Sequence, residues 1–119
     1  MKKTSTKIEK LLIVGKKGMI VVPLSKILYF KKCKHKTQVI ISKKESYEIT
    51  ESLKKLEDIL PSYFFRCHNS LLDNLHYIKE FQNSTNNCII LENNMFINIS
   101  RHRKQEFEEK LKEMMYCVE

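Results

Sequence analysis

Hydrophobic residues occur along this chain in short runs separated by polar turns, and no run exceeds the six residues 19–24. Short runs rich in Ile, Val and aromatic residues between turn-forming residues are typical of β-strands. The pattern predicts strands at residues 7–15, 19–22, 27–31, 37–42, 78–81, 88–91 and 95–99. Hairpins are expected around residues 15–18 and at Asn93-Asn94, because Gly and Asn tolerate the positive φ of tight turns. Residues 83–87 are expected to form a further turn.

Two segments instead repeat their apolar residues at spacings of three and four, which indicates α-helices. These residues are Leu53, Leu56 and Leu60 in the first segment, and Phe107, Leu111 and Met114 in the second. Pro61 ends the first helix, predicted at 52–60, because it lacks an N–H. Ser100 is the expected N-cap of the second helix, predicted at 101–116. Short strands with one central and one terminal helix predict a β-rich α+β fold.

The length of 119 residues and the 42% hydrophobic content indicate one domain, residues 1–119, with enough apolar surface for a core. A large multidomain enzyme is excluded, and this composition disfavours wholesale disorder. A membrane-spanning helix needs about twenty apolar residues, far more than any run in the chain. The basic N-terminus lacks the apolar segment and cleavage site of a signal peptide, so a cytoplasmic location is expected.

Positive charge is concentrated in the first third of the chain. The net charge is +8 overall, yet residues 1–44 hold 13 Lys against the single acid Glu9. Residues 45–119 hold 9 Lys and Arg against 13 acids. This asymmetry indicates a polyanionic partner, either nucleic acid or an anionic membrane surface, although Lys side chains that are merely solvated would give the same count.

Three polar segments carry side chains that a hydrophobic core does not need: residues 31–36 (KKCKHK), 66–70 (RCHNS) and 101–104 (RHRK). Lys-rich segments neutralise phosphates, Asn pairs with adenine, and Arg pairs with guanine. The third segment places cations in the first turn of the terminal helix, where the helix dipole disfavours them. Bound phosphates would explain cations at this position, because helix N-termini bind anions. The alternative explanation is that the Glu residues one turn later neutralise these cations.

The four Cys residues and their His neighbours offer weaker alternatives. A zinc site from Cys33, His35, Cys67 and His68 lacks the usual chelating spacing. A hydrolase built on Cys67 with His76 or His102 lacks an oxyanion site. No enzyme activity, metal or cofactor is therefore expected.

Redox control through Cys67 is a separate hypothesis. Arg66 and His68 flank this residue, and positive neighbours lower a thiol pKa. Oxidation beside a nucleic-acid contact would then block binding, whereas an ordinary buried Cys would play no such role.

The motifs in three blocks of the chain resemble the LytTR family of bacterial DNA-binding domains. Residues 52–61 (SLKKLEDILP) match the family's SLKxLExxLP helix, and residues 64–78 match its FxRxHxSxLVNxxYI block. Residues 97–104 (INISRHRK) match its closing IPVSR segment, with Asn98 in place of Pro, and residues 27–30 resemble its opening strand. The blocks occur in the family's order, and the resemblance covers residues 8–113.

The resemblance implies an elongated fold of small packed antiparallel sheets, with a short central helix and a C-terminal helix, whose loops enter successive major grooves of double-stranded DNA. The implied base contacts are Thr37, His68, Asn69 and Arg101. The implied phosphate contacts are Lys34, Lys36, Ser70, His102, Arg103 and Lys104. Family regulators commonly occupy paired direct repeats, so a dimer on DNA is expected.

Fewer than ten residues precede the first predicted strand, so the family's frequent receiver domain is not expected. A domain without a receiver needs another means of control. A protein-interaction module held by an inhibitory partner, for which some relatives have a membrane protein, is therefore the main alternative. The end of the terminal helix, residues 114–116, is a candidate docking surface for such a partner, or else the end of the core-facing stripe.

Overall fold

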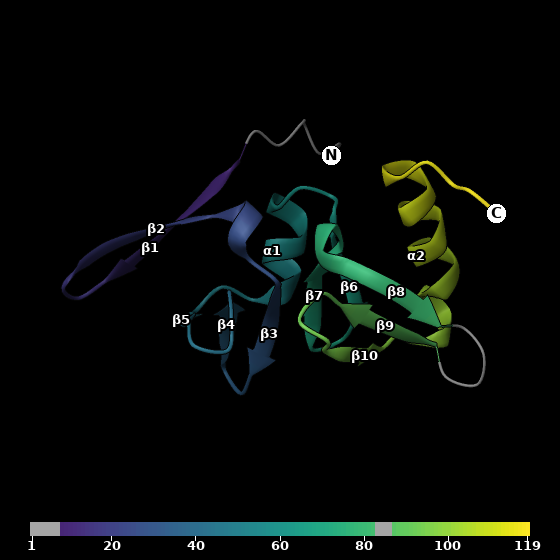
Figure 1. The fold of residues 1–119 in the computed structure, drawn as a ribbon. Helices are drawn as coiled ribbons and strands as arrows, with labels where there is room; N and C mark the ends of the chain where they lie inside the picture. The colour runs from purple at the N-terminus through teal and green to yellow at the C-terminus, as the bar shows by residue number, and fades with distance from the viewer. Residues whose placement is uncertain (1–7, 83–86) are drawn as a thin grey trace.

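The computed structural model describes residues 8–82 and 87–119, and it shows three antiparallel sheets in a row with two helices (Figure 1). The ten strands and two helices are β1 (Lys10–Gly15), β2 (Gly18–Pro23), β3 (Tyr29–Cys33), β4 (Lys36–Ile40), β5 (Ser46–Ile49), α1 (Leu53–Ile59), β6 (Phe64–His68), β7 (Leu71–Asn74), β8 (Ile78–Gln82), β9 (Cys88–Leu91), β10 (Phe96–Asn98) and α2 (Arg101–Met114). The molecule extends over 50 × 33 × 23 Å. The predicted elongated β-rich α+β fold is confirmed.

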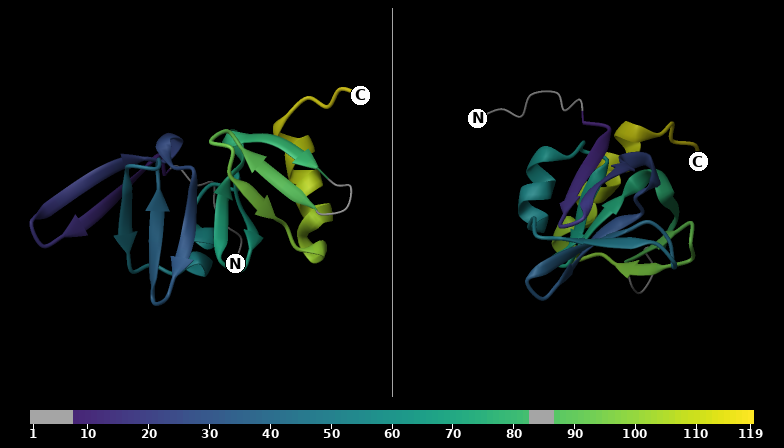
Figure 2. Two further views of the ribbon diagram at one scale, coloured as in Figure 1. Left: turned by 60° about the horizontal axis from the view of Figure 1, so that its bottom comes forward. Right: turned by 90° about the vertical axis from the view of Figure 1, so that its left-hand side faces the viewer.

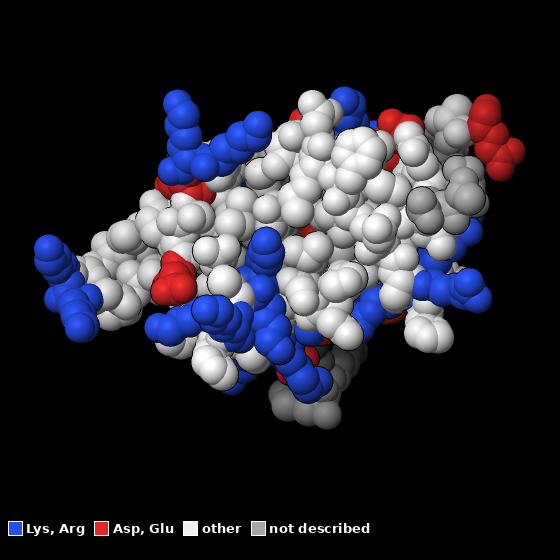
Figure 3. All heavy atoms as spheres, turned by 90° about the horizontal axis from the view of Figure 1, so that it is seen from below, with Lys and Arg blue, Asp and Glu red and all other residues white. Residues whose placement is uncertain are grey.

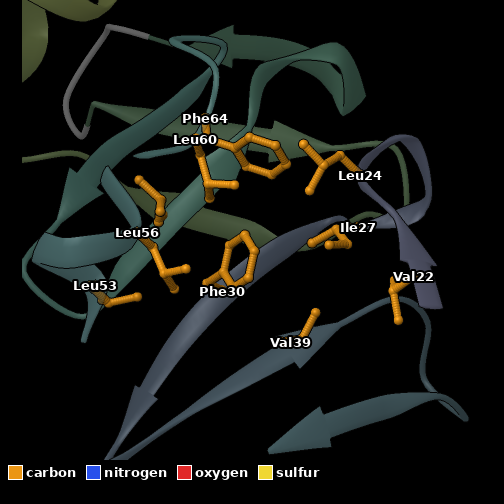
Figure 4. Packing of buried hydrophobic residues seen from close by; sticks show 10 residues of the cluster. Val22, Leu24, Ile27, Phe30, Val39, Leu53, Leu56, Leu60 and Phe64 are labelled. Atoms are coloured by element: carbon orange, nitrogen blue, oxygen red, sulfur yellow. The ribbon is translucent and has the colours of Figure 1, made fainter. Parts of the chain in front are cut away.

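The central sheet has five strands in the order β5-β4-β3-β7-β6. Helix α1 lies against β3, β6 and β7; its Leu56 and the following C-cap residue Leu60 pack with Phe30 of β3 (Figure 4). All three side chains are at most 1% exposed. The base of the β1–β2 hairpin adds Val22 to this first core. This core fixes α1 and the hairpin to the central sheet.

A second core lies between the central sheet, the three-stranded sheet β10-β9-β8 and α2. Phe107 of α2 is fully buried, with its ring centroid 4.9 Å from that of Phe81 and 5.7 Å from that of Phe65. Leu111 and Met114 are half-buried around it, as the helical spacing predicts. These contacts hold the beginning of α2 beside β6.

The two predicted helices are confirmed, and their starts differ in how they are capped. Ser52 accepts a hydrogen bond from the Lys55 N–H at 3.1 Å, which is an ordinary N-cap. Ser100 occupies the N-cap position of α2, but in the described structure its side chain makes no capping hydrogen bond. The first turn of α2 is therefore not satisfied by its own cap side chain.

The central sheet is more extensive than the sequence pattern predicts. Residues 66–70, expected as a loop, belong largely to the β6–β7 hairpin, which turns at Asn69-Ser70. Residues 32–36, also expected as a loop, continue β3 and begin β4, so that the turn shrinks to Lys34-His35. Strand β5 was not predicted. Lys7, at the start of the first predicted strand, and residues 83–86 of the predicted turn lie outside the described residues.

Candidate nucleic-acid interface

The three polar segments lie along one edge of the molecule, the lower edge in Figure 1. Because β3 is antiparallel to both β4 and β7, the β3–β4 turn and the β6–β7 turn share one end of the central sheet. The Lys32 N–H donates to the Ser70 carbonyl at 2.9 Å and joins the two turns. Arg103 Nη1 donates to the Arg66 carbonyl at 2.7 Å and joins the first turn of α2 to β6. We call residues 31–36, 66–70 and 101–104 the loop edge.

Positive side chains dominate the loop edge. Lys31, Lys32, Lys34 and Lys36 are all exposed, and His35 is exposed between them. Seen from below, Lys and Arg side chains form a broken band across this face, and Asp and Glu are fewer (Figure 3). A shallow groove continues the band toward α1; it is lined by Lys32, Lys34, Lys36, Lys54 and Arg66, with Glu51 as its one acid. A strip of this charge suits the phosphates of a polyanion.

The Arg66 side chain organises the β6–β7 turn. Its Nε donates to the His68 carbonyl at 3.2 Å, and its Nη2 donates to the Asn69 carbonyl at 2.7 Å. Its Nη1 lies 3.3 Å from a carboxylate oxygen of Glu57 on α1. The guanidinium fork therefore holds the turn backbone and ties it to the helix. The sequence offered no signal for this role beyond an Arg inside a polar segment.

His68 and Asn69 present their side chains from this fixed turn to solvent. The Ser70 N–H donates to His68 Nδ1 at 3.1 Å, so a neutral His68 carries its proton on Nε2. His68 thus offers one ring N–H donor to an outside partner, and Asn69 offers both a donor and an acceptor. Ser70 itself is half-buried and belongs to the turn's framework.

The first turn of α2 contributes three cations and one histidine to the loop edge. Arg101 and His102 are exposed, whereas Arg103 and Lys104 are half-buried. The Arg103 guanidinium is already engaged with β6, which gives it a role in positioning the helix. Arg101 and His102 are therefore the side chains most available to a ligand.

Thr37 does not fit the predicted base contact. Its side chain is 2% exposed, and its hydroxyl donates to the Glu51 carbonyl at 2.6 Å. This hydrogen bond ties β4 to the segment before α1. The exposed residues of this part of the loop edge are instead those of the β3–β4 turn, where Lys34 adopts a φ of 58°.

The hypothesis of a reactive Cys67 thiolate is wrong. Successive side chains of a strand point to opposite faces, so Arg66 and His68 do not surround the thiol. Cys67 is fully buried, and its Sγ donates to Asp73 Oδ2 at 2.8 Å. Burial, followed by the negative charge of Asp73, raises the pKa of the thiol. The proton therefore stays on sulfur, and a buried thiol of this kind is inert.

Asp73 is a buried carboxyl group three residues after Ser70, where the β6–β7 turn ends. It lies on β7, opposite Phe65 on one side and Tyr29 on the other, and is fully buried. Its Oδ1 has no hydrogen-bond partner among the described residues. Burial raises the pKa of Asp73 to about 7, although the hydrogen bond from Cys67 acts in the opposite direction. The group therefore exchanges its proton near neutral pH.

Replacing Asp73 with Asn is expected to remove a pH dependence of stability. Between the ordinary pKa of 3.8 and the folded pKa of about 7, the folded state holds a proton that the unfolded state has lost. The contribution of Asp73 to the free energy of unfolding is thus largest below pH 3.8 and is lost as pH rises through about 7. The loss approaches about 1.4 kcal/mol per pH unit.

Urea denaturation at several pH values from about 5.5 to 8.5 measures this effect, because that interval brackets the folded pKa. The Asp73→Asn protein should show a flatter profile than the unmodified protein. Equal slopes for the two proteins would show that Asp73 does not hold the proton.

Two other features were searched over the described residues alone. No cluster of three or more His, Cys, Asp or Glu side chains there is placed to hold a metal ion. No helix within residues 8–82 and 87–119 has the length and hydrophobicity needed to cross a membrane.

The fold and the positively charged loop edge together define a class of protein, a β-rich DNA-binding domain. Residues 17–112 match the LytTr DNA-binding domain family, and the chain belongs to this family. The resemblance seen in the sequence motifs is thereby confirmed.

Known relatives agree with this assignment. The chain is 34% identical over 104 residues to the transcriptional regulatory protein YpdB of Escherichia coli K12 and to that of Shigella flexneri. The match covers 82% of this chain and 41% of those relatives, so the chain spans less than half of their length. The structure also matches the LytTr DNA-binding domain of a methyl-accepting/DNA response regulator from Bacillus cereus, with a TM-score of 0.73 and 25% identity over 87% of this chain and 97% of that one.

Proposed function

We propose that this chain acts as a sequence-specific transcriptional regulator whose loop edge reads the major groove of double-stranded DNA. The observation that supports this proposal is the convergence of three separate polar segments on one positively charged edge. Family membership supports DNA as the polyanion. A bacterial, cytoplasmic protein bound to promoters is the corresponding biological role.

Base reading is assigned to the exposed side chains of two segments. Asn69 has the donor and acceptor that pair with adenine, and Arg101 has the fork that pairs with guanine. His68 supplies a single donor from Nε2, which suits a base acceptor in the major groove. These three residues stand on backbone held by Arg66 and Arg103, which favours fixed geometry over non-specific attraction.

Phosphate binding is assigned to the positively charged and polar side chains that flank the base-reading residues. Lys34 and Lys36 lie on the β3–β4 side, and His102 and Lys104 lie at the start of α2, with Ser70 between the two groups. Arg103, first expected as a phosphate contact, serves chiefly to position α2 in this proposal. Contacts with phosphates supply salt-dependent affinity but carry no sequence information.

Two copies on paired direct repeats are part of the proposal. Each copy would place its loop edge against one repeat, so that two copies form a dimer on the DNA. An inhibitory protein that holds the free domain remains an alternative mode of control, which would use a surface away from the loop edge.

Selection from a pool of random duplexes at about physiological salt tests the proposal, because specific and non-specific binding separate there. Enrichment of a short repeated motif supports sequence-specific regulation. Retention without a motif would indicate a general DNA-coating protein, and the absence of binding even at low salt would overturn the proposal.

The Arg101→Ala and Lys34→Asn variants are expected to weaken DNA binding in different ways. Loss of the Arg101 fork should weaken binding to the selected site by about 1–3 kcal/mol and relax one base preference. Lys34→Asn should weaken binding to all duplexes alike and reduce the slope of log K against log salt by about one. Asn is chosen because it tolerates the positive φ of residue 34.

Binding isotherms on the selected site and on a random duplex, each at several salt concentrations, separate the two effects. Equal losses on both duplexes for Arg101→Ala would contradict its assignment to base reading.

A further inference from the structure

The outer face of the β1–β2 hairpin carries four apolar side chains that are open to solvent, with Lys10 at its base. Leu12 pairs with Val21, and Val14 pairs with Met19, so these four side chains lie on one face of the two-stranded ribbon. Their exposed fractions are 58%, 57%, 67% and 66%, respectively. We call this group the hairpin face.

The opposite face of the same hairpin already packs on the protein. Leu11, Ile13 and Val22 lie against the first core, and this anchors the base of the hairpin. A two-stranded sheet with one face in water normally carries polar side chains on that face. Here both faces are mainly apolar, and among the described strands β1 and β2 pair only with each other. An exposed apolar patch of this kind marks a binding surface.

A second apolar surface lies at the other end of the molecule. Beyond the last turn of α2, Met115, Tyr116 and Val118 are 45%, 93% and 79% exposed. With Leu111 and Cys117 they line a shallow groove, which we call the tail face. The hairpin projects from one end of the elongated molecule, and α2 with the C-terminus lies at the other (Figures 1 and 2). The two faces of one chain therefore cannot meet.

The charges around the two faces are opposite. Residues 10–23 contain three Lys and no acid, with Lys16 and Lys17 at the hairpin tip. Residues 106–119 contain five Glu and two Lys, and this excess of acids surrounds a groove that both Glu108 and Lys112 line. Apolar centres with complementary charged rims are typical of protein–protein interfaces.

We propose that the hairpin face of one copy binds the tail face of a second copy of this chain. Such a head-to-tail contact is heterologous, so every copy keeps the same orientation along the row. Direct repeats also present their sites in one orientation, whereas a two-fold symmetric contact would suit inverted repeats. The contact itself does not depend on DNA; its use on direct repeats rests on the function proposed above.

Sedimentation velocity of the free protein, over concentrations up to about 0.5 mM, tests the contact without DNA, because weak interfaces have dissociation constants in the micromolar to millimolar range. The unmodified chain should sediment faster as its concentration rises, and without a plateau at the dimer, because a heterologous contact is open-ended. A hairpin variant with Val14→Glu and Val21→Glu should require at least about tenfold higher concentration to associate. A tail variant with Met115→Ser and Tyr116→Ser should behave in the same way.

The decisive sample is an equimolar mixture of the two variants. Each variant keeps the face that the other has lost, so the mixture should form dimers but nothing larger. A Phe96→Ser protein, altered at a residue that is 66% exposed outside both faces, should associate like the unmodified chain. Circular dichroism of each variant checks that these outward substitutions leave the fold intact.

Three outcomes would overturn the proposal. Association of the tail variant alone would indicate a hairpin-to-hairpin contact between copies. If the unmodified chain is a monomer at every concentration, the hairpin face does not bind a second copy and would instead bind a different protein. If the mixture of the two variants fails to dimerise, the hairpin face does not bind the tail face. DNA binding is measured separately on single sites, so a failed contact leaves the proposed function standing.

Discussion

Replacing Phe107 with Ala is expected to lower the free energy of unfolding by about 3–5 kcal/mol, the range for a fully buried aromatic side chain. Phe107 is fully buried, and its ring contacts Phe81 and Phe65, from the second sheet and the central sheet, respectively. No other α2 side chain is fully buried. Its loss therefore leaves a cavity and removes the main contact between the helix and the rest of the domain.

Chemical denaturation of the two proteins measures this difference. A Phe96→Ala protein is the matched control, because Phe96 is 66% exposed and its loss should change stability by no more than about 0.5 kcal/mol. DNA affinity should fall together with stability, because Arg101 and His102 reach the loop edge only while α2 is docked. A loss below about 1 kcal/mol would show that α2 is held mainly by other contacts.

Arg66→Lys is expected to reduce affinity for the selected DNA site by about tenfold to one hundredfold, equal to about 1.4–2.7 kcal/mol. Lys keeps the positive charge but cannot hold both the His68 and the Asn69 carbonyls in the planar fork that Arg provides. The turn then loses the geometry that presents its two base-reading side chains. Affinity for random DNA should change little, since the charge is unchanged.

The Glu57→Gln protein provides the control for this experiment. It removes the charge opposite Arg66 Nη1 while leaving both turn hydrogen bonds in place. The ion pair is partly exposed, so its loss should alter binding by less than about threefold. If Glu57→Gln weakened specific binding as much as Arg66→Lys, the ion pair and not the turn would be the important contact.

The parts of the fold that local pattern predicts are those with one buried face. The Leu53, Leu56 and Leu60 stripe predicts α1 because one side of that helix packs on the sheet and the other is solvated. Strand β6 is not predicted by such a pattern, because its Phe64 and Phe65 are both buried, one in each core. A strand covered on both faces shows no alternation, so the sequence pattern does not predict this strand.

The sequence identifies the three polar segments of the site but not how they lie relative to one another. The sequence placed His68, Asn69 and Arg101 in polar segments, and all three are exposed, whereas Thr37 is buried. What brings the segments together is the pairing of β3 with β7, a long-range contact that no local window contains. The same holds for the hydrogen bond from Arg103 to Arg66, which joins residues 37 positions apart.

Cys67 shows the limit of reasoning from sequence neighbours. Arg66 and His68 adjoin it in the chain, yet on a strand they point to the other face. Burial raises its pKa most, and Asp73, brought alongside by the β6–β7 hairpin, raises it further. Burial, which no flanking charge reveals, reverses the expected direction of the shift.

The central claim is that one edge of this domain, built from three separate segments, binds DNA. NMR titration of the labelled protein with its selected duplex tests it most directly, since a chain of 119 residues gives resolved amide signals. The largest shifts are expected at residues 34–36, 68–70 and 101–104, with residues 12–21 of the hairpin unchanged at one protein per site. Shifts gathered on the hairpin or on the C-terminal end of α2, with the loop edge unaffected, would contradict the account.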